Sequence, residues 1–401
     1  MVTVAIICEY NPFHTGHEYQ INKIREEFGE DTAIIAIMSG NFTQRGDVAC
    51  ADKFLRAECA VKCGANLVLE LPFPFSCSSA EFFASAGVEI ADAISCVDYL
   101  SFGSELGNAK KLTEIANNML SPLFIEKTAT SPSIKYRGLG YPVLVSQVYN
   151  ELYSDSIDEA FFSPNNILAI EYIKALIRKK SRIRPHTFTR LGADYNEENL
   201  INCEHQSATA IRNSIANDKI SALDYLPDSC KNTMIEHLND FPCDIEKIAS
   251  AIISFFRLND LCDVEIQDAN GGLYNRIRSA SFNADSIKQL ISLSDTKKYT
   301  TARIKRAIIN SFFGVTSSKI RELPMYTQLL ATDKIGQAIL KRIKKSTRIP
   351  VLTKPSAIDL LNDGAKEQKS LCDRADSIFQ LTKPTFVNGS ASLTATPFIM
   401  K

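Results

Sequence analysis

The amino-acid sequence predicts an α/β fold, in which a parallel sheet covered by helices on both faces precedes a mainly helical C-terminal domain. In the first hundred residues, short apolar runs alternate with amphipathic stretches, and this rhythm is typical of open parallel sheets. Beyond about residue 218 the strand rhythm ends, and residues 230–345 show mainly helical spacing. We therefore predict a Rossmann-like domain over residues 1–220 and a mainly helical domain over residues 221–401.

The expected strands are short apolar runs, the first of them rich in β-branched residues and continuous, as in a strand buried on both faces of a sheet. They cover residues 2–8, 32–38, 66–71, 98–102 and 186–190. Helices are expected over residues 16–28, 52–63, 79–93 and 164–178, and a further helix opens at 207–212. Asp52 is the expected N-cap of the second helix, and Gly64 lies just past its end. The segment after Lys383 is rich in Ser, Thr, Pro and Ala and is expected to be poorly ordered.

Length and composition limit the classes of protein to consider. A chain of 401 residues is long enough for two domains. Its net charge of −1 gives no global attraction to nucleic acid, so an RNA partner would need a local basic patch. The eleven cysteines include no CxxC pair, and we interpret them as reduced. No apolar run reaches the ~18 residues that span a bilayer, so we expect a cytoplasmic protein with no membrane contact.

Chemistry is expected at the carboxyl ends of the predicted strands, where ligands bind in open parallel sheets. Polar loops that contain glycine or proline follow four of these strands, at residues 9–17, 39–46, 72–76 and 103–105. Packing alone does not explain this distribution. The sequence therefore predicts a ligand site at this edge of the sheet.

The strongest feature is the string Pro12-Phe13-His14-Thr15-Gly16-His17, directly after the first strand and at the start of a helix. A helix N-terminus offers unpaired N–H groups to an anion, and a glycine allows a nucleotide to approach closely. The two imidazoles can donate hydrogen bonds to phosphoryl oxygens as charge develops. We predict His14 and His17 as catalytic residues. Two surface histidines near a helix cap are the simpler alternative. A zinc site would lack a nearby third ligand, so no metal site is predicted.

Further anion ligands are expected outside this loop. Ser207, Thr209 and Arg212 lie at a helix start, where hydroxyl and N–H groups can bind phosphate; an ordinary N-cap is the alternative. Arg190 ends a predicted strand, from which a guanidinium can bind phosphate in bidentate fashion, unless it forms a surface salt bridge. Lys53 is predicted as a further catalytic cation near the phosphates, with a solvated lysine in the first turn of a helix as the alternative.

The N-terminal region resembles the HxGH nucleotidyltransferase superfamily, whose members join ATP to a small acid or phosphate and release pyrophosphate. The whole chain resembles the bacterial tRNA(Met) cytidine acetate ligases. The similarity covers most of the chain and rests on the strings EYNPFHTGH (9–17), MSGNFTQRG (38–46), SFGSE (101–105), SPNNIL (163–168), SATAIR (207–212), YTTARIKR (299–306) and TKPS (353–356).

This resemblance implies an ATP-dependent ligase. Such an enzyme activates acetate as acetyl-adenylate and transfers the acetyl group to N4 of the wobble cytidine of elongator tRNA(Met), with release of AMP and pyrophosphate. It implies ATP, with Mg²⁺ expected beside it, and acetate and elongator tRNA(Met) as partners.

Carried over by motif, the ATP-binding residues form one continuous stretch and a few distant positions. They are Ile7, Cys8, Glu9, Tyr10, Asn11, Pro12, Phe13, His14, Thr15, Gly16, His17, Glu18, Tyr19, Gln20, Gly103, Asn165, Arg190, Ser207, Thr209 and Arg212. Asn166 is the alternative to Asn165. After Arg190 the sequence departs from the family pattern, because Asp194 stands where the family has a glycine.

The loop after the second strand carries Gly40, Asn41, Gln44 and Arg45. These residues are suited to holding an acyl adenylate or a base edge, and we predict that they form the acetate or adenylate pocket. An ordinary polar loop is the alternative.

Three basic clusters could contact tRNA phosphates, at residues 178–184, 297–306 and 341–348. The middle cluster combines an aromatic residue with basic residues at helical spacing. We therefore predict that tRNA is bound by Lys297, Lys298, Tyr299, Arg303 and Arg306, with the tyrosine stacking on an exposed base. A solvated helix face is the alternative for each cluster.

Two other classes of function stay open at this point. One is a small-molecule adenylyltransferase, which would not need a large helical domain with basic clusters. The other is a non-catalytic RNA-binding protein that keeps an ATP pocket, against which the intact His14, Gly16 and His17 argue. The sequence predicts no oligomeric state.

Overall fold

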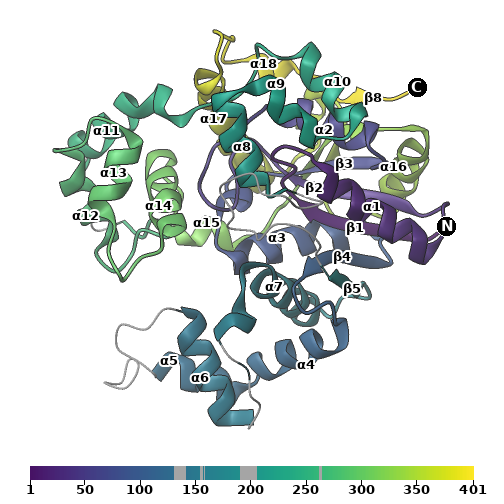
Figure 1. Ribbon diagram of the computed structural model, residues 1–401, viewed down its shortest axis with the longest axis horizontal. Coiled ribbons are helices and arrows are strands. Elements are labelled where there is room, and N and C mark those ends of the chain that lie inside the picture. The colour runs from purple at the N-terminus through teal and green to yellow at the C-terminus, as the bar shows by residue number, and fades with distance from the viewer. Residues whose placement is uncertain (131–140, 154–156, 158, 190–205, 262–263) are drawn as a thin grey trace.

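An eight-stranded sheet forms the centre of the computed structural model, with the strand order β5-β4-β1-β2-β3-β6-β7 and with β8 paired to β6 (Figure 1). The structure describes residues 1–130, 141–153, 157, 159–189, 206–261 and 264–401. The strands are β1 (Thr3–Cys8), β2 (Ala33–Ser39), β3 (Leu67–Leu71), β4 (Tyr99–Ser104), β5 (Arg184–Thr189), β6 (Thr327–Thr332), β7 (Val351–Leu352) and β8 (Phe398–Ile399). The pairs that join β1 to β5 are parallel, as the sequence predicts.

The helices that follow these strands match the predicted positions closely in the first part of the chain. Their bounds are α1 (Thr15–Phe28), α2 (Lys53–Lys62), α3 (Ala80–Ala93), α4 (Ala109–Met119), α5 (Pro122–Thr130), α6 (Tyr141–Tyr153), α7 (Pro164–Lys179), α8 (Ala208–Asn217), α9 (Lys219–Ala222), α10 (Asp228–Glu236), α11 (Ala249–Leu258), α12 (Leu273–Ser281), α13 (Ile287–Ser294), α14 (Thr301–Phe313), α15 (Ser317–Arg321), α16 (Lys334–Ser346), α17 (Asp363–Phe379) and α18 (Ala391–Thr394). Within the described ranges, none of these helices combines the length and apolarity that crossing a bilayer requires.

The continuous apolar run of β1 is explained by burial on both faces of the sheet. Ala5 and Ile7 pack into one core with α3, α4 and α7, whereas Val4 and Ile6 pack into a second core with α1, α2 and α8. Successive side chains of a strand point to opposite faces, so both faces must be apolar. This arrangement leaves the loops at the carboxyl ends of the strands as the open edge of the sheet.

Side-chain caps fix where the site-forming helices begin. Asp52 accepts a hydrogen bond from the backbone N–H of Phe54, and Ser207 accepts one from Ala210, as expected for N-caps. Gly64 follows α2 with φ +108°, a backbone conformation that favours glycine. The predicted starts of both helices are therefore confirmed.

The helices α11–α14 form a separate body with its own apolar core, built around residues such as Ile252, Phe256, Leu273 and Ile304. Figure 1 shows this body to the side of the sheet, while α4, α5 and α6 project below it. The helical spacing that the sequence shows in this region is thus present in the structure.

The sheet also takes strands from the part of the chain assigned to the helical domain. β6 runs antiparallel to β3, and β8 pairs with β6. The expectation of poor order after Lys383 is therefore wrong for β8, whose neighbour Met400 donates its backbone N–H to Thr332. β6 pairs with β3 and β8 with β6, and local spacing does not reveal such pairing between segments far apart in the chain. The domain boundary near residue 220 stays a prediction.

Close packing between α16 and the sheet gives a test of this arrangement. A Cβ on Gly336 would overlap the backbone carbonyl of Asn66, which precedes β3. We expect Gly336→Ala to lower the free energy of unfolding by about 1–3 kcal/mol, because backbone atoms cannot move aside easily. Denaturant unfolding measures this. Gln337→Ala, an exposed neighbour on the same helix, should change it by less than about 0.5 kcal/mol, and equal effects of the two substitutions would contradict the packing argument.

Candidate active site

A cavity of about 1470 Å³ of empty space, including its open mouth, lies at the carboxyl ends of β1 and β4. Most of its lining comes from the end of β1 with the start of α1, the loop after β2, the end of β4, α7 and the start of α8, and Phe83 of α3 and Phe188 of β5 complete it. The polar part of its lining comprises Glu9, Asn11, His14, His17, Gln20, Thr43, Gln44, Arg45, Asp47, Asn165, Gln206, Ser207, Thr209 and Arg212. The sequence-predicted edge of the sheet is thus where the cavity lies.

His14 and His17 lie against each other at the start of α1. Their ring centroids are 3.8 Å apart, and the rings are tilted by 37°. His14 is the N-cap of α1, and its Nδ1 accepts the backbone N–H of Gly16 at 3.1 Å. Nδ1 of His17 in turn accepts the backbone N–H of His14 at 3.2 Å. The two side chains therefore form a reciprocal cap at the helix start.

These backbone bonds decide the form of both imidazoles. A nitrogen that accepts a hydrogen bond carries no proton, so the neutral rings hold their proton on Nε2. An Nε2–H group is a hydrogen-bond donor, and donors of this kind stabilise charge that develops on phosphoryl oxygens. Each of the two histidines can therefore donate one hydrogen bond from its Nε2–H group, close to the positive end of the α1 dipole.

The turn between β1 and α1 is held by buried side chains. Tyr10 has φ +45°, which is unusual for a residue other than glycine, and both Tyr10 and Phe13 are buried. Asn11 accepts the backbone N–H of Cys50 through its side chain, while its carbonyl oxygen accepts a hydrogen bond from Arg212 at 2.8 Å. The turn therefore connects the first loop to the segment before α2 and to α8.

The start of α8 supplies a second group of anion ligands to the same cavity. Ser207, Thr209 and Arg212 all line it, and Arg212 donates to Thr209 Oγ1 at 3.0 Å. Because a helix N-terminus carries partial positive charge, the cavity meets two such charges, from α1 and from α8. This is the arrangement that the sequence predicts for a triphosphate.

The loop after β2 is divided between the cavity and the protein interior. Gln44 and Arg45 line the cavity, whereas Gly40 and Asn41 do not. The backbone N–H of Gln44 donates to Glu9 Oε1 at 2.7 Å, and burial raises the pKa of the Glu9 carboxyl. Two of the four residues of the predicted acyl pocket are thus placed to contact a ligand.

Arg56 of α2 joins the first two loops and was missed by sequence reasoning. Its side chain is 1% exposed and donates to the backbone carbonyl oxygens of Glu9, Ser39, Gly40 and Ala51. Each of these carbonyls lies where β1 or β2 ends or where α2 begins. The sequence did offer one signal for Arg56: it lies one helical turn after Lys53, so both side chains belong to the same face of the helix.

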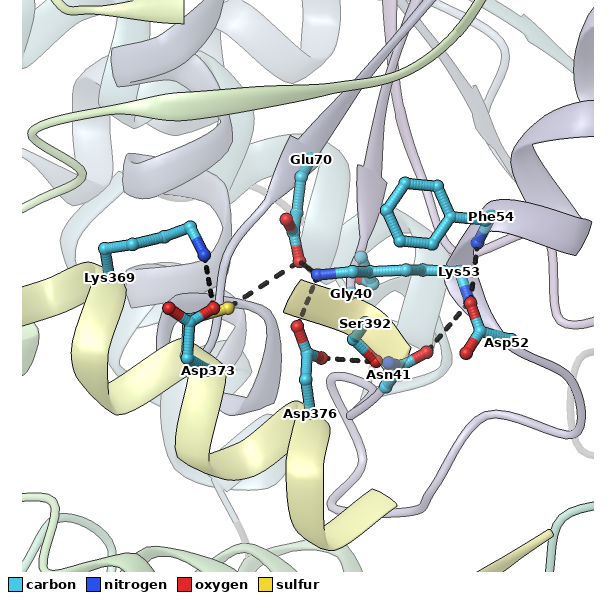
Figure 2. A network of polar contacts seen from close by, with 12 residues as sticks. Gly40, Asn41, Asp52, Lys53, Phe54, Glu70, Lys369, Asp373, Asp376 and Ser392 are labelled. Atoms are coloured by element: carbon cyan, nitrogen blue, oxygen red, sulfur yellow. Dashed lines mark hydrogen bonds and ion pairs between the residues drawn. The ribbon is translucent and has the colours of Figure 1, made fainter. Parts of the chain in front are cut away.

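Lys53 lies in the interior and not in the cavity lining (Figure 2). Its ammonium is 2.7 Å from Glu70 Oε1 and 2.6 Å from Asp376 Oδ2, and all three side chains are buried. Two carboxylates therefore neutralise the charge that was predicted to face phosphate. The structure places Lys53 beneath the loop after β2, where its ammonium joins Glu70 of β3 to Asp376 of α17.

The two asparagines of the SPNN string have different surroundings. Asn165 lines the cavity, and its amide donates to Glu105 Oε1 at 2.6 Å. Asn166 is 3% exposed, and its Oδ1 accepts the backbone N–H groups of Glu105 and Leu106. The position of Asn165 fits the predicted ligand contact, and Asn166 stabilises the turn after β4.

The remaining predicted nucleotide residues are placed as follows. Ile7, Cys8, Glu9, Tyr10, Asn11, Gly16, Tyr19, Gln20 and Gly103 line the cavity, whereas Pro12, Phe13, Thr15 and Glu18 do not. Arg190 lies outside the described residues. Sequence reasoning missed the apolar lining by Phe83, Leu168, Tyr172 and Phe188, because these side chains belong to ordinary amphipathic helix and strand patterns.

The predicted tRNA residues gather before and on α14 but are not equally accessible. Lys297 and Lys298 are exposed and Arg303 is half-buried. Tyr299 is only 7% exposed, its ring lies beneath Lys298 and Arg303, and its hydroxyl donates to Gly271. Little of the Tyr299 ring is left for a base to stack on in this conformation, because Lys298 and Arg303 already cover it; the stacking role stays a prediction.

Arg306 joins the helical body to the cavity. It is buried, forms an ion pair with Asp268 at 2.9 Å, and donates to the carbonyl oxygen of Gln44 at 3.3 Å. Lys305 pairs with Asp47 at 2.6 Å, and a Cβ on Gly46 would meet the Arg306 backbone nitrogen at 2.5 Å. The loop after β2 therefore packs directly on α14.

Comparison with known proteins agrees with this geometry. The HIGH Nucleotidyl Transferase family model matches residues 1–392. Curated tRNA(Met) cytidine acetate ligases of Clostridium novyi (strain NT) and Clostridium tetani (strain Massachusetts / E88) are each 37% identical to the chain, over 88% and 90% of it and over 90% and 92% of their own length. The chain belongs to the tRNA(Met) cytidine acetate ligase family.

Solved structures of this family extend the similarity to the whole fold. Thermotoga maritima TmcAL bound with alpha-thio ATP superposes with a TM-score of 0.89 at 27% identity, covering 100% of this chain and 99% of that one. The apo form of the same protein gives a TM-score of 0.91 at 26% identity and covers 100% of both chains. The α/β nucleotidyltransferase fold predicted from the sequence is thus confirmed.

The different roles of the two asparagines give a prediction. Asn166→Ala removes the acceptor of two backbone N–H groups, so we expect the free energy of unfolding to fall by about 1–2 kcal/mol. Asn165→Ala should lower it by less than about 0.5 kcal/mol, because that side chain faces the cavity. Thermal and denaturant unfolding measure both values. The reverse order would contradict the placement of the two side chains.

Proposed function

We propose that this protein is an ATP-dependent ligase that forms acetyl-adenylate and acetylates N4 of the wobble cytidine of elongator tRNA(Met), with release of AMP and pyrophosphate. One observation carries the proposal: the N-termini of α1 and α8, with the stacked His14–His17 pair on one and Arg212 on the other, meet at a single cavity. The names of its curated relatives and the ATP analogue bound to Thermotoga maritima TmcAL support it.

In the first step, a carboxylate oxygen of acetate attacks the α-phosphorus of ATP, and the bond to pyrophosphate breaks. Nε2–H groups of His14 and His17 donate to the phosphoryl oxygens that gain charge, and the N-terminus of α1 adds its partial positive charge. Ser207, Thr209 and Arg212 hold the leaving pyrophosphate. Positioning and charge stabilisation supply most of the rate in such chemistry, so no general base is needed.

In the second step, the N4 amine of cytidine attacks the carbonyl carbon of acetyl-adenylate, and AMP leaves. Cys8 is the thiol in the cavity lining, but burial raises its pKa, so it stays protonated and is unsuited as a nucleophile. Direct transfer from the adenylate to tRNA therefore fits the cavity better than a route through an acyl-enzyme.

Mg²⁺ is expected with ATP, but the described residues offer no prepared protein site for it. The group of potential ligands that they contain is Glu70, Cys372 and Asp376. The ammonium of Lys53 already bonds both of these carboxylates, and none of the three residues lines the cavity. We therefore propose that Mg²⁺ enters on the ATP phosphates, as it commonly does.

A cleft of about 2260 Å³ of empty space, including its open mouth, lies beside the cavity and is the proposed site for tRNA. Lys297, Lys298 and Arg303 line one wall, and the start of α3 with α7 forms the other. Phe82 lines the cleft while Phe83 lines the cavity, so the two spaces are separated by the width of one helix. A nucleotide held in this cleft is near acetyl-adenylate. A tRNA and ATP substrate pair is consistent with the expected cytoplasmic location.

The reaction itself is the first test. Unmodified elongator tRNA(Met) is incubated with the protein, ATP-Mg²⁺ and isotope-labelled acetate, and its nucleosides are analysed by mass spectrometry. We expect labelled N4-acetylcytidine only when ATP is present. His17→Ala should lower the rate by about 10²–10³-fold, because it removes one donor to the reacting phosphoryl group. His237→Ala, at a half-buried histidine paired with Asp240, is the matched control and should not change it.

Two outcomes would favour the other classes of function. Pyrophosphate release without any change in the cytidine would indicate an adenylyltransferase with another acceptor. If RNA binding were retained but no ATP cleavage occurred in the unsubstituted protein, a non-catalytic RNA-binding protein would be indicated.

The tRNA cleft gives a separate prediction. Reversing two charges with Lys297→Glu and Lys298→Glu should weaken tRNA binding at least 10-fold and reduce the slope of log affinity against log salt by about 2, because two phosphate contacts are lost. Acetate-dependent ATP–pyrophosphate exchange should stay unchanged. Filter binding at several salt concentrations measures the affinity.

The control carries the same change of charge on α16, as Lys344→Glu with Lys345→Glu, two exposed residues of another basic cluster. If the α16 variant loses tRNA affinity and the cleft variant does not, tRNA binds over α16 and the assignment of the cleft is wrong.

A further inference from the structure

The loop after β2 is fixed from below by one amide side chain. Asn41 is 1% exposed; its Oδ1 accepts the backbone N–H of Lys53 at 2.8 Å, and its Nδ2 donates to Asp376 Oδ1 at 2.9 Å. Figure 2 shows Asn41 between the start of α2 and helix α17. Residues 335 positions apart in the sequence are thereby joined directly under the loop.

Asp376 holds Asn41 and Lys53 together. One carboxylate oxygen of Asp376 accepts from Asn41, and the other pairs with the Lys53 ammonium at 2.6 Å. Lys53 also pairs with Glu70 of β3. The carboxylate is therefore used at both oxygens, and it couples α17 to α2, to β3 and to the loop.

The fixed point lies two residues before the part of the loop that lines the cavity. Asn41 is followed by Phe42, which packs against Phe73 and Phe379, and then by Thr43, Gln44 and Arg45, which line the cavity. The carbonyl oxygen of Asn41 accepts the backbone N–H of Ala49, so the loop closes on itself. A shift at Asn41 is therefore transmitted to Gln44 and Arg45.

The charges of this network are costly for a purely structural element. Lys53 is a single cation between two buried carboxylates, and one oxygen of Glu70 has no hydrogen-bond partner. Burial raises the pKa of Asp376 to about 6, although Lys53 acts in the opposite direction. Apolar side chains of similar volume often stabilise a core as well as such a network does. Polar groups of this kind instead select one conformation, here that of the loop.

We propose that Asp376 is a positioning residue for the acyl substrate: through Asn41 it holds Gln44 and Arg45 at the acyl end of the cavity. This inference rests on the proposed function, because it takes acetate as the ligand at that end. The ATP phosphates are held by α1 and α8, which do not contact Asp376, so acetate and ATP respond differently to a change at this residue.

The test is acetate-dependent ATP–pyrophosphate exchange with Asp376→Asn. The amide cannot accept at both positions, so the link to Asn41 or to Lys53 is lost. We expect the KM for acetate to rise about 10-fold and the KM for ATP to change less than about 2-fold. The matched control is Asp373→Asn, one turn earlier on α17, where the carboxylate pairs with Lys369. That variant should leave both KM values unchanged.

Exchange of the two side chains provides the decisive comparison. In the double variant Asn41→Asp with Asp376→Asn, the new carboxylate accepts from the new amide and from the Lys53 backbone N–H, while the amide oxygen faces the ammonium. We expect the KM for acetate to return to within about 3-fold of its original value. A purely structural role would not give this recovery in acetate KM alone.

Three results would overturn the proposal: equal changes in both KM values, an unchanged acetate KM, or the same effect from Asp373→Asn. If Asp376→Asn does not fold, Asn41→Ala gives the same readout, because it removes the amide link and keeps both ion pairs of Lys53. Absence of acetate-dependent exchange in the unsubstituted protein would instead refute the proposed function, so the two failures are distinguishable.

Discussion

The guanidinium of Arg56 occupies the point at which β1 and β2 end, and the active-site loops depend on it. Backbone carbonyl groups converge there from the first loop, the second loop and the start of α2. Buried carbonyl oxygens need donors, and water cannot enter a site that is 1% exposed. Arginine satisfies this demand because its five N–H groups form one rigid planar fork. The loop between β1 and α1 and the loop after β2 are therefore held by the same side chain.

Lys53 and Arg56 show how one helix can hold a site without reaching into it. They are one turn apart on α2, and both are fully buried. Arg56 bonds the backbone of the two loops, whereas Lys53 acts through Asn41 and Asp376. The guanidinium of Arg56 also brings positive charge close to the cavity, whereas the charge of Lys53 is neutralised by Glu70 and Asp376. The two side chains thus both support the loops, but they differ in what they contribute to the electrostatics of the cavity.

The parts of the site that could be predicted from the sequence are those with a local cause. Apolar runs, helix caps and the loops between them depend on neighbouring residues, so β1–β5, the N-caps Asp52 and Ser207, and the position of His14 and His17 could be predicted.

Other assignments depend on partners far along the chain. Lys53 looks like a surface cation until Asp376, 323 positions away, is placed beside it. Asn165 and Asn166 are alike in sequence, and only the helical turn decides which one faces the cavity. Tyr299 has the pattern of a stacking platform, but packing against Gly271 removes it from solvent.

The close packing of Gly46 on α14 couples the position of the helical body to that of the loop after β2. The backbone of this loop rests on the backbone at Lys305 and Arg306, and two side-chain contacts join the same elements. A polynucleotide that displaces α14 must displace the loop as well. Linkage then requires a mutual effect: occupancy of the adenylate cavity alters the affinity for RNA by the same factor by which RNA alters the affinity for the adenylate. Any movement of the helical body at α14 would therefore also change the lining of the cavity.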